Sequence, residues 1–377
     1  MTTLRLSKLI ALAVGFSALN GFAADSGLRF LNEYSIPTDK TFQQVKFGGL
    51  SGIAWDQQKN VYYSISDARN TPAEGVARFY TLKIDVNDKG INRVDILSMK
   101  ELTDEQGLSF KTQEVDGESL ALTPDKKNLL WTSELGSPLR LSSLDGKLIK
   151  DYADKVPAWY NAGGDLKKAP EGLRNGLTFE SSTVTPSGKF VYIAAESALK
   201  QDGNISTTVS SSPVRILKYT VQSDGNVGEL VGEFIYNVDP IPQVTKHGVN
   251  DNGLAEMLAI SDDKLLITER AGRNASEGFN DFDFTIKTYL ADVSQASNIK
   301  GEKSLNAIEK KNLLQPVSKK MLIDFNDYTK APDCIEAMTF GPLINGKKSL
   351  LFVSDNNFQP YQANKFFVFV DDNGVLN

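Results

Sequence analysis

A hairpin motif that occurs five times constrains this chain more than any other feature of its sequence. Each copy opens with six residues rich in small and apolar side chains, then passes through a turn into a second β-rich segment. The opening segments are residues 50–55, 117–122, 179–184, 255–260 and 335–340. A β-rich repeat of about 60 to 80 residues predicts a radial array of similar sheets rather than one unique core.

The sequence after each hairpin predicts further strands. A third strand that opens with or near Arg or Lys is expected at residues 78–82, 140–144, 215–219, 287–290 and 365–369. A fourth strand is expected in four copies, at residues 93–99, 147–152, 228–236 and 320–325. The fifth copy ends at Asn377 before its fourth strand, and residues 28–36 form a spare one.

These strands predict an all-β fold, a β-propeller of five four-stranded blades. We expect the N-terminal strand to pair with the last blade, because this closes the ring and removes an exposed sheet edge. A sixth, degenerate blade could lie in the longer gaps at residues 238–253 or 294–317.

Residues 1–23 have the pattern of a secretory signal peptide. Arg5 and Lys8 precede an apolar run at residues 9–18, and small residues follow at 21 and 23. The alternative is an uncleaved N-terminal anchor. We expect residues 24–377 to form a single propeller domain in a periplasmic or secreted protein. No later segment has the roughly 20 apolar residues that a membrane span requires.

The charge balance disfavours polyanionic partners. The chain has 41 Lys and Arg against 47 Asp and Glu, and loss of Arg5 and Lys8 gives 39 − 47 = −8. Nucleic acids and anionic membranes are bound through Lys and Arg, so we expect neither. A monomer that acts on a small molecule is the expectation. The only cysteine, Cys334, cannot form an intramolecular disulfide, and we predict a small buried residue there.

The repeat places acidic residues at one end of the array. Alignment of the copies puts these at one equivalent position: Glu118, Glu180, Glu256 and Glu336, with Ser51 in the first copy. The second strand returns to the same end, near Asp67, Glu134, Glu196, Glu269 and Asp355. The fourth copy is two residues shorter, so Arg270 rather than Glu269 is in strict register there.

A ring of carboxylates needs neutralisation. Two like charges about 4 Å apart repel by roughly 4 kcal/mol at an effective dielectric constant of 20. Cations such as Ca²⁺, basic residues of the third strands, or protons could each relieve this repulsion. Three interpretations stay open. The glutamates could accept backbone N–H bonds that lock neighbouring blades, form a functional carboxylate or metal ring, or do so in only some copies.

Other catalytic patterns are nearly absent from the sequence. His247 is the only histidine and lies in a polar stretch, so we predict a solvated loop residue. A Ser-His-Asp triad would have to use it, and no Gly-x-Ser-x-Gly elbow occurs. One His and one Cys exclude a His/Cys zinc site. Any hydrolysis must therefore depend on carboxylates, basic residues and a metal-bound water.

A series of motifs resembles a known family. In chain order these are residues 50–53, 65–67, 77–80, 175–181, 195–199, 201–203, 266–270, 335–342 and 353–358. Together they resemble the phytase-like family described as having esterase-like activity, over nearly all of the mature chain. The family is similar to β-propeller phytases, which are exported, calcium-dependent phosphatases with six blades. The resemblance implies a propeller, an exported location, and hydrolysis of esters or phosphoesters.

Two main hypotheses for function follow. In the first, a hydrolase of phosphoesters or carboxylic esters, Glu118, Glu180, Glu256 and Glu336 hold a divalent cation or act as general base. Arg69, Arg174 and Arg270 receive an anionic group of the substrate. Asp67, Glu134, Glu196 and Asp355 are further metal ligands, with Ca²⁺ as the candidate cofactor. In the second, the propeller binds a small ligand, a metal or an envelope partner without chemistry. A scaffold in which the acids only lock blades is a third reading.

Overall fold

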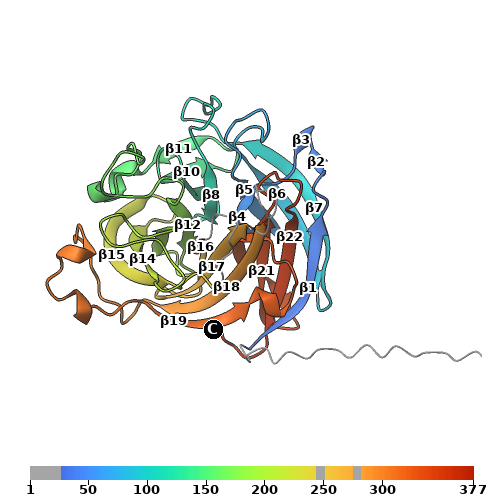
Figure 1. The fold of residues 1–377 in the computed structure, drawn as a ribbon. Helices are drawn as coiled ribbons and strands as arrows, with labels where there is room; N and C mark the ends of the chain where they lie inside the picture. The colour runs from blue at the N-terminus through green and yellow to red at the C-terminus, as the bar shows by residue number, and fades with distance from the viewer. Residues whose placement is uncertain (1–26, 243–250, 275–281) are drawn as a thin grey trace, which may run out of the picture.

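The computed structural model describes residues 27–242, 251–274 and 282–377, and its strands form a ring of five blades (Figure 1). The predicted signal peptide and His247 lie outside these residues. Each blade is a four-stranded antiparallel sheet. The prediction of a five-bladed propeller is therefore confirmed.

The strands of each blade follow one another from the axis outward. Blade 1 consists of β4 (Leu50–Asp56), β5 (Val61–Ser66), β6 (Arg78–Asn87) and β7 (Gly90–Glu101). Blade 2 consists of β8 (Gly117–Leu122), β9 (Asn128–Ser133), β10 (Leu139–Ser143) and β11 (Leu148–Asp151). Blade 3 consists of β12 (Phe179–Val184), β13 (Phe190–Ala195), β14 (Ser212–Val221) and β15 (Val227–Val238).

Blade 4 consists of β16 (Gly253–Ala259), β17 (Lys264–Asn274), β18 (Phe282–Asp292) and β19 (Ser318–Asp324). Blade 5 consists of β20 (Cys334–Ile344), β21 (Lys347–Asp355), β22 (Asn364–Asp371) and the N-terminal β1 (Leu28–Ile36). A short ribbon of β2 (Thr41–Phe42) and β3 (Val45–Lys46) follows β1.

Strand β1 closes the ring. It pairs antiparallel with β22 from Leu28 opposite Asp371 to Ile36 opposite Asn364, as Figure 1 shows where blue meets red. The last blade thus takes its outer strand from the other end of the chain. The pairing satisfies the backbone edge of β22, which would otherwise be open to another strand.

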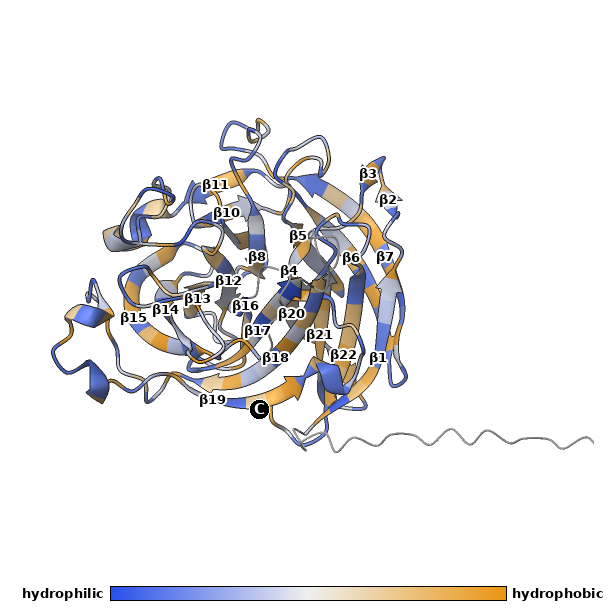
Figure 2. Ribbon diagram, in the orientation of Figure 1, coloured by the Kyte–Doolittle hydropathy of each residue, from blue (hydrophilic) through white to orange (hydrophobic). Residues whose placement is uncertain are grey.

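The hydrophobic core is divided among the interfaces between blades. Five clusters of buried side chains each join one neighbouring pair of blades. Between blades 4 and 5, for example, Leu266 packs with Phe352 and Phe367. Hydrophobic and hydrophilic residues are interspersed along the outer strands β1 and β15 (Figure 2), as expected for sheets that are partly exposed to water.

The inner strands approach one another closely. A Cβ at Gly52 of β4 would lie 2.8 Å from the backbone nitrogen of Leu120 in β8. Only a residue without a side chain fits at this contact. The small residues of the repeat therefore allow the inner strands of neighbouring blades to pack closely around the axis.

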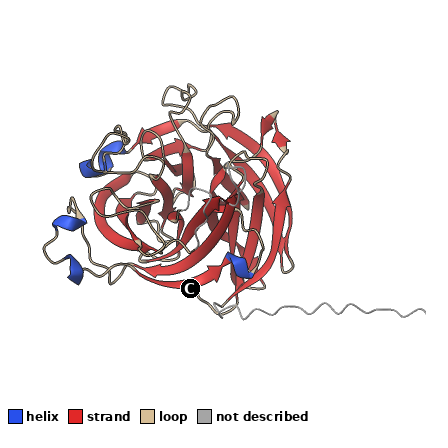
Figure 3. Ribbon diagram, viewed as in Figure 1, coloured by secondary structure: helices blue, strands red, loops and turns tan. Residues whose placement is uncertain are grey.

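The helices are short and lie in loops outside the blades (Figure 3). They are 3₁₀ turns: η1 (Ala153–Lys155), η2 (Ala158–Tyr160), η3 (Leu305–Ala307), η4 (Lys311–Leu313) and η5 (Phe325–Asp327). Turns η3 and η4 occupy the gap at residues 294–317, which holds no sixth blade. Within the described residues no helix is long and apolar enough to cross a membrane.

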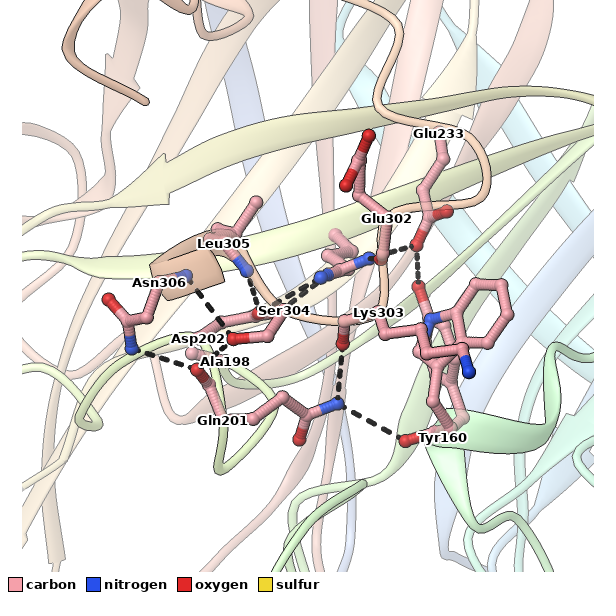
Figure 4. Close-up of polar contacts among 12 residues, drawn as sticks. Tyr160, Ala198, Gln201, Asp202, Glu233, Glu302, Lys303, Ser304, Leu305 and Asn306 are labelled. Carbon is pink, nitrogen blue, oxygen red and sulfur yellow. Dashed lines mark hydrogen bonds and ion pairs between the residues drawn. The ribbon is translucent and has the colours of Figure 1, made fainter. Parts of the chain in front are cut away.

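A buried ion-pair network attaches two of these loops to blade 3. The Arg215 guanidinium binds both oxygens of Asp202, at 2.5 and 2.9 Å, and Oε1 of Glu233 at 2.8 Å. Tyr160 of η2 donates to the same Glu233 oxygen, and the backbone N–H of Leu305 in η3 donates to Asp202. Figure 4 shows how these polar contacts link residues 160, 201–202, 233 and 302–306.

Candidate acidic site at the axial mouth

The first strands of the five blades line the axis, each in contact with the first strands of both neighbouring blades. Antiparallel pairing returns each second strand to the end at which the first one begins, as in Leu50 opposite Ser66 and Gly117 opposite Ser133. Acids gather at this end. We call the group the acidic mouth and define it as Asp67, Asp116, Glu118, Glu134, Glu180, Glu196, Glu336 and Asp355, with Arg69 and Arg270.

Arg270 of β17 is the cation inside this group. Its Nη2 lies 2.7 Å from Oε1 of Glu196 and 3.6 Å from Oε1 of Glu180, and its Nη1 pairs with Oε1 of Glu336. The guanidinium thereby joins blades 3, 4 and 5. The fourth repeat is two residues shorter than the first three, and this places Arg270 at the position that an acid occupies in those copies.

Neighbouring Glu269 points elsewhere. Its carboxylate accepts hydrogen bonds from Tyr236, Asn252 and Lys319. These partners come from blades 3 and 4 and the segment before β16, so Glu269 does not contribute to the acidic mouth.

Three carboxylates of blade 2 converge. Asp116 and Glu118 flank the start of β8, and Glu134 follows the end of β9. One oxygen of each lies within 4.8 Å of the others. Oxygen ligands at 2.3–2.6 Å from a Ca²⁺ ion are separated from one another by up to about 5 Å. The three oxygens therefore have a spacing that one such ion could bridge.

Asp67 and Asp355 lie beside each other where blade 1 meets blade 5. Gly49 has a positive φ of 69°, and a Cβ there would lie 2.1 Å from Oδ1 of Asp67. The glycine both permits the turn before β4 and leaves room for this carboxylate. Its carbonyl accepts the backbone N–H of Asp67 at 2.9 Å, which fixes the residue at the mouth.

Burial raises the pKa of these acids. Burial is the largest cause for Asp116, with the carboxylate of Glu134 adding to it, and the pKa reaches about 8 although Arg69 opposes the shift. Burial raises the pKa of Glu196 to about 7 and that of Asp355 to about 6. The pKa values of Asp67, Glu118 and Glu180 rise well above their usual range for the same reason, and neighbouring carboxylates add to each shift. Without a cation, part of the mouth holds protons at neutral pH.

Several carboxylate oxygens of the mouth have no partner. Oδ1 of Asp67, Oε2 of Glu180 and Oδ2 of Asp355 are buried and accept no hydrogen bond from the described residues. A buried oxygen left unsatisfied costs free energy. Hard divalent cations such as Ca²⁺ bind such oxygens in loose geometry. The carboxylates of the mouth are therefore suited to bind a divalent cation, because they do not satisfy one another by hydrogen bonds.

Some acids accept backbone N–H groups from the neighbouring blade, and these acids include both residues at the ends of second strands and one leading glutamate. Glu134 of blade 2 accepts the backbone N–H of Thr178, just before blade 3, at 2.7 Å. Asp355 of blade 5 accepts the backbone N–H of Leu50, the first residue of β4 in blade 1. Glu256, a leading glutamate of blade 4, likewise accepts the backbone N–H of Ser182 in blade 3, so the blade-locking role considered for the leading glutamates is found for Glu256.

Glu256 does not join the acidic mouth. Its carboxylate lies across the axis, where it accepts hydrogen bonds from Oγ of Ser119 at 3.1 and 3.2 Å and from the backbone N–H of Met257 at 2.8 Å. It faces a cavity at the opposite end of the inner strands. Burial raises its pKa well above the usual range.

The three predicted substrate-binding arginines differ in their surroundings. Arg69 is at the rim, with a side chain 39% exposed, and binds Glu74 at 2.5 Å while lying 3.8 Å from Asp116. Arg270 is enclosed by acids. Arg174 donates to the carbonyls of Ala198 and Gly203, which holds the loop after β13, and burial rather than a carboxylate is the cause of its pKa shift, which is downward.

Sequence reasoning missed Asp116, Cys334 and Glu74 as members of this environment. Asp116 stands two residues before the aligned Glu118, and no other copy has an acid at this offset, so the repeat gave no signal for it. Cys334 is buried as predicted, but its Sγ lies 3.4 Å from Nη1 of Arg270 and 3.3 Å from Oε1 of Glu336. Burial raises the pKa of this thiol to about 12, so it stays protonated.

The fold and the mouth define a five-bladed β-propeller with an acidic axial site. The chain belongs to the Phytase-like family, described as "Esterase-like activity of phytase", which matches residues 45–358. No curated protein sequence matches the chain.

Solved structures to which the chain is similar include the periplasmic gluconolactonase PpgL of Pseudomonas aeruginosa, at 10% identity and a TM-score of 0.37 over 91% of this chain and 96% of that one. A member of the DUF4221 family from Bacteroides vulgatus matches at 9% identity and a TM-score of 0.39, over 91% and 98% of the two chains. The N-terminal domain of Nup159 matches at 10% identity and a TM-score of 0.33, over 91% and 95%.

Proposed function

We propose that the protein is an exported, divalent-metal-dependent hydrolase of phosphoesters or carboxylic esters that acts at the acidic mouth. The observation that carries this proposal is the set of buried carboxylate oxygens without partners beside the convergent Asp116, Glu118 and Glu134. Membership of the Phytase-like family supports the reaction class.

The cation site would be built on blade 2. Asp116, Glu118 and Glu134 would hold the ion, and Ca²⁺ is the candidate because it accepts several carboxylate oxygens in flexible geometry. When bound, a divalent ion supplies Lewis-acid polarisation of an ester or phosphoryl oxygen. Glu180 and Asp67, with their unpartnered oxygens, lie close enough to Glu118 to raise its pKa, and they extend the site along the mouth.

The two arginines have separate roles. Arg69 is the more exposed, and its guanidinium can receive an anionic oxygen of the substrate at the rim. Arg270 is a positioning residue, because it is bound to Glu196 and Glu336 and has little exposed surface.

Glu196 is the group best suited to proton transfer. Its pKa of about 7 lies near neutral pH, where a general base is most effective. One of its oxygens, Oε1, is held by Arg270, which leaves Oε2 to take up or release a proton.

The direct test is turnover of an aryl phosphoester and an aryl acyl ester by the full chain, with Ca²⁺ and after chelation. We expect Ca²⁺-dependent hydrolysis that Asp116→Asn and Glu118→Gln each reduce about 100-fold, as the loss of a ligand or of electrostatic stabilisation does in other enzymes. The matched control is Asp145→Asn, whose side chain is 88% exposed and lies in the turn between β10 and β11, at the end of blade 2 opposite the mouth.

Turnover that survives chelation and both substitutions would contradict the proposal. Stabilisation by Ca²⁺ without turnover of either substrate would contradict catalysis and support the alternative of a binding propeller.

A further inference from the structure

A second cavity lies at the opposite end of the axis from the acidic mouth. It has a volume of about 600 Å³ and is lined by the last residues of the inner strands of all five blades. Representative lining residues are Trp55, Leu122, Val184, Ile260 and Phe340. Small-molecule sites in proteins typically measure about 300–1,000 Å³ and are mostly apolar. The size and wall of this cavity match a ligand of that class.

The inner end of the cavity carries one carboxyl group. Glu256 lies there and accepts hydrogen bonds from Ser119 and Met257, and burial raises its pKa well above the usual range. Burial therefore favours the neutral form of this carboxyl group, which repels an anion less than a carboxylate does.

The outer rim is basic. Lys126 and Lys348 belong to the lining, and Glu256 is the only acid among the lining residues. The Lys348 ammonium donates to the carbonyl of Leu376, which leaves further N–H donors for a ligand. Leu343, 62% exposed, lies at the same rim and offers apolar surface to an incoming molecule.

One hydrogen-bond donor in the wall has no partner. The indole Nε1 of Trp55 is buried and donates to no acceptor among the described residues. A buried donor without an acceptor is costly, but this atom has almost no accessible surface, so a ligand in the cavity reaches it only if the wall around Trp55 shifts. The apolar wall and the two lysines of the lining are what favour a ligand with an apolar body and an anionic group.

We propose that this axial cavity is a second ligand site, which binds a small amphipathic monocarboxylate with its apolar body against the inner strands and its carboxylate near Lys126 and Lys348. The site is independent of the proposed hydrolytic function, because none of the acidic-mouth residues lines it.

The test uses calorimetry and tryptophan fluorescence on the full chain with octanoate, octan-1-ol and octylammonium. Trp55 lies in the wall, so occupancy should change its emission. We expect saturable binding, with the highest affinity for octanoate, a lower affinity for octanol and the lowest for octylammonium. The double variant Lys126→Ala/Lys348→Ala should weaken octanoate about tenfold and leave octanol unchanged, because it removes only the charge interaction. Lys127→Ala is the matched control, since Lys127 is 79% exposed and outside the lining.

A cavity-filling variant separates this site from other surfaces. Ala121→Phe should abolish binding of both octanoate and octanol, with retention of the fold checked by circular dichroism and thermal unfolding. No saturable octanoate binding by the native chain would overturn the proposal. Octanol binding as tightly as octanoate, with no effect of the lysine substitutions, would overturn it as well.

Discussion

The guanidinium of Arg270 on β17 donates from Nη2 to Oε1 of Glu196, at the end of β13, over 2.7 Å. This hydrogen bond crosses from blade 4 to blade 3, and the same guanidinium reaches Glu336 of blade 5. The fourth repeat thus contributes a cation at the position where blades 1, 2, 3 and 5 contribute acids. Arg270 therefore holds acids of blades 3 and 5 together at the mouth.

Arg270→Met should lower the free energy of unfolding by about 3 kcal/mol at pH 8 in the presence of a chelator, because Glu196 and Glu336 lose their buried partner. The loss should be smaller at pH 5, where these acids can take up protons instead. Saturating Ca²⁺ should restore part of the stability at pH 8. Urea unfolding of the native chain and the variant at pH 8 with chelator, at pH 5 with chelator and at pH 8 with Ca²⁺ measures these differences in the free energy of unfolding.

The matched control for this substitution is Arg174→Met. It also removes a guanidinium, but one that binds the carbonyls of Ala198 and Gly203. Its effect should be the same with and without Ca²⁺ and at both pH values. An Arg270→Met loss that responded to neither Ca²⁺ nor pH would refute the role of Arg270 among the acids.

The stability of the metal-free protein should fall as pH rises from about 5 to about 8. The folded-state pKa is about 8 for Asp116, about 7 for Glu196 and about 6 for Asp355, each above its value in an unfolded chain. At a pH between the unfolded-state and the folded-state pKa of each acid, the folded state binds more protons than the unfolded state. The free energy of unfolding therefore decreases as pH rises. Urea unfolding at several pH values in chelator checks the sign, and Asp116→Asn should flatten the upper part of the curve.

Binding of Ca²⁺ should release protons at pH 7. The ion requires ionised carboxylates, whereas Asp116 is largely protonated at this pH in the free protein. Affinity should therefore rise with pH, opposite to the trend in metal-free stability. Calorimetry in two buffers of different ionisation enthalpy measures the protons released. Equal apparent enthalpies in both buffers, for native protein and Asp116→Asn alike, would show that no such coupling exists.

The sequence predicted the blades well because their signals are local and repeated. Strand β1 matches the expected residues 28–36, and the length of the fourth repeat indicated Arg270 rather than Glu269. The structure was needed for Glu256 and Arg174, because side-chain direction within a strand and the partners of a loop are tertiary choices. Asp116 occurs in one copy only, so no repeat could reveal it. The unpartnered oxygens of Asp67 and Glu180 depend on burial, which no sequence pattern states.

Arg215 should matter for stability and not for the acidic mouth. Its side chain is 1% exposed, and Arg215→Met would leave Asp202 and Glu233 buried without their cation, at a cost of about 3 to 5 kcal/mol. Calcium affinity should stay unchanged in the folded fraction, since Arg215, Asp202 and Glu233 bind one another and none of them belongs to the acidic mouth. The control is Arg93→Met, which breaks the exposed pair between Arg93 and Asp95 at 2.9 Å and should cost less than about 1 kcal/mol. Urea unfolding and calcium calorimetry on both variants test the separation. A fall in calcium affinity that matched the loss of stability in Arg215→Met would show that the loops and the mouth form one coupled unit.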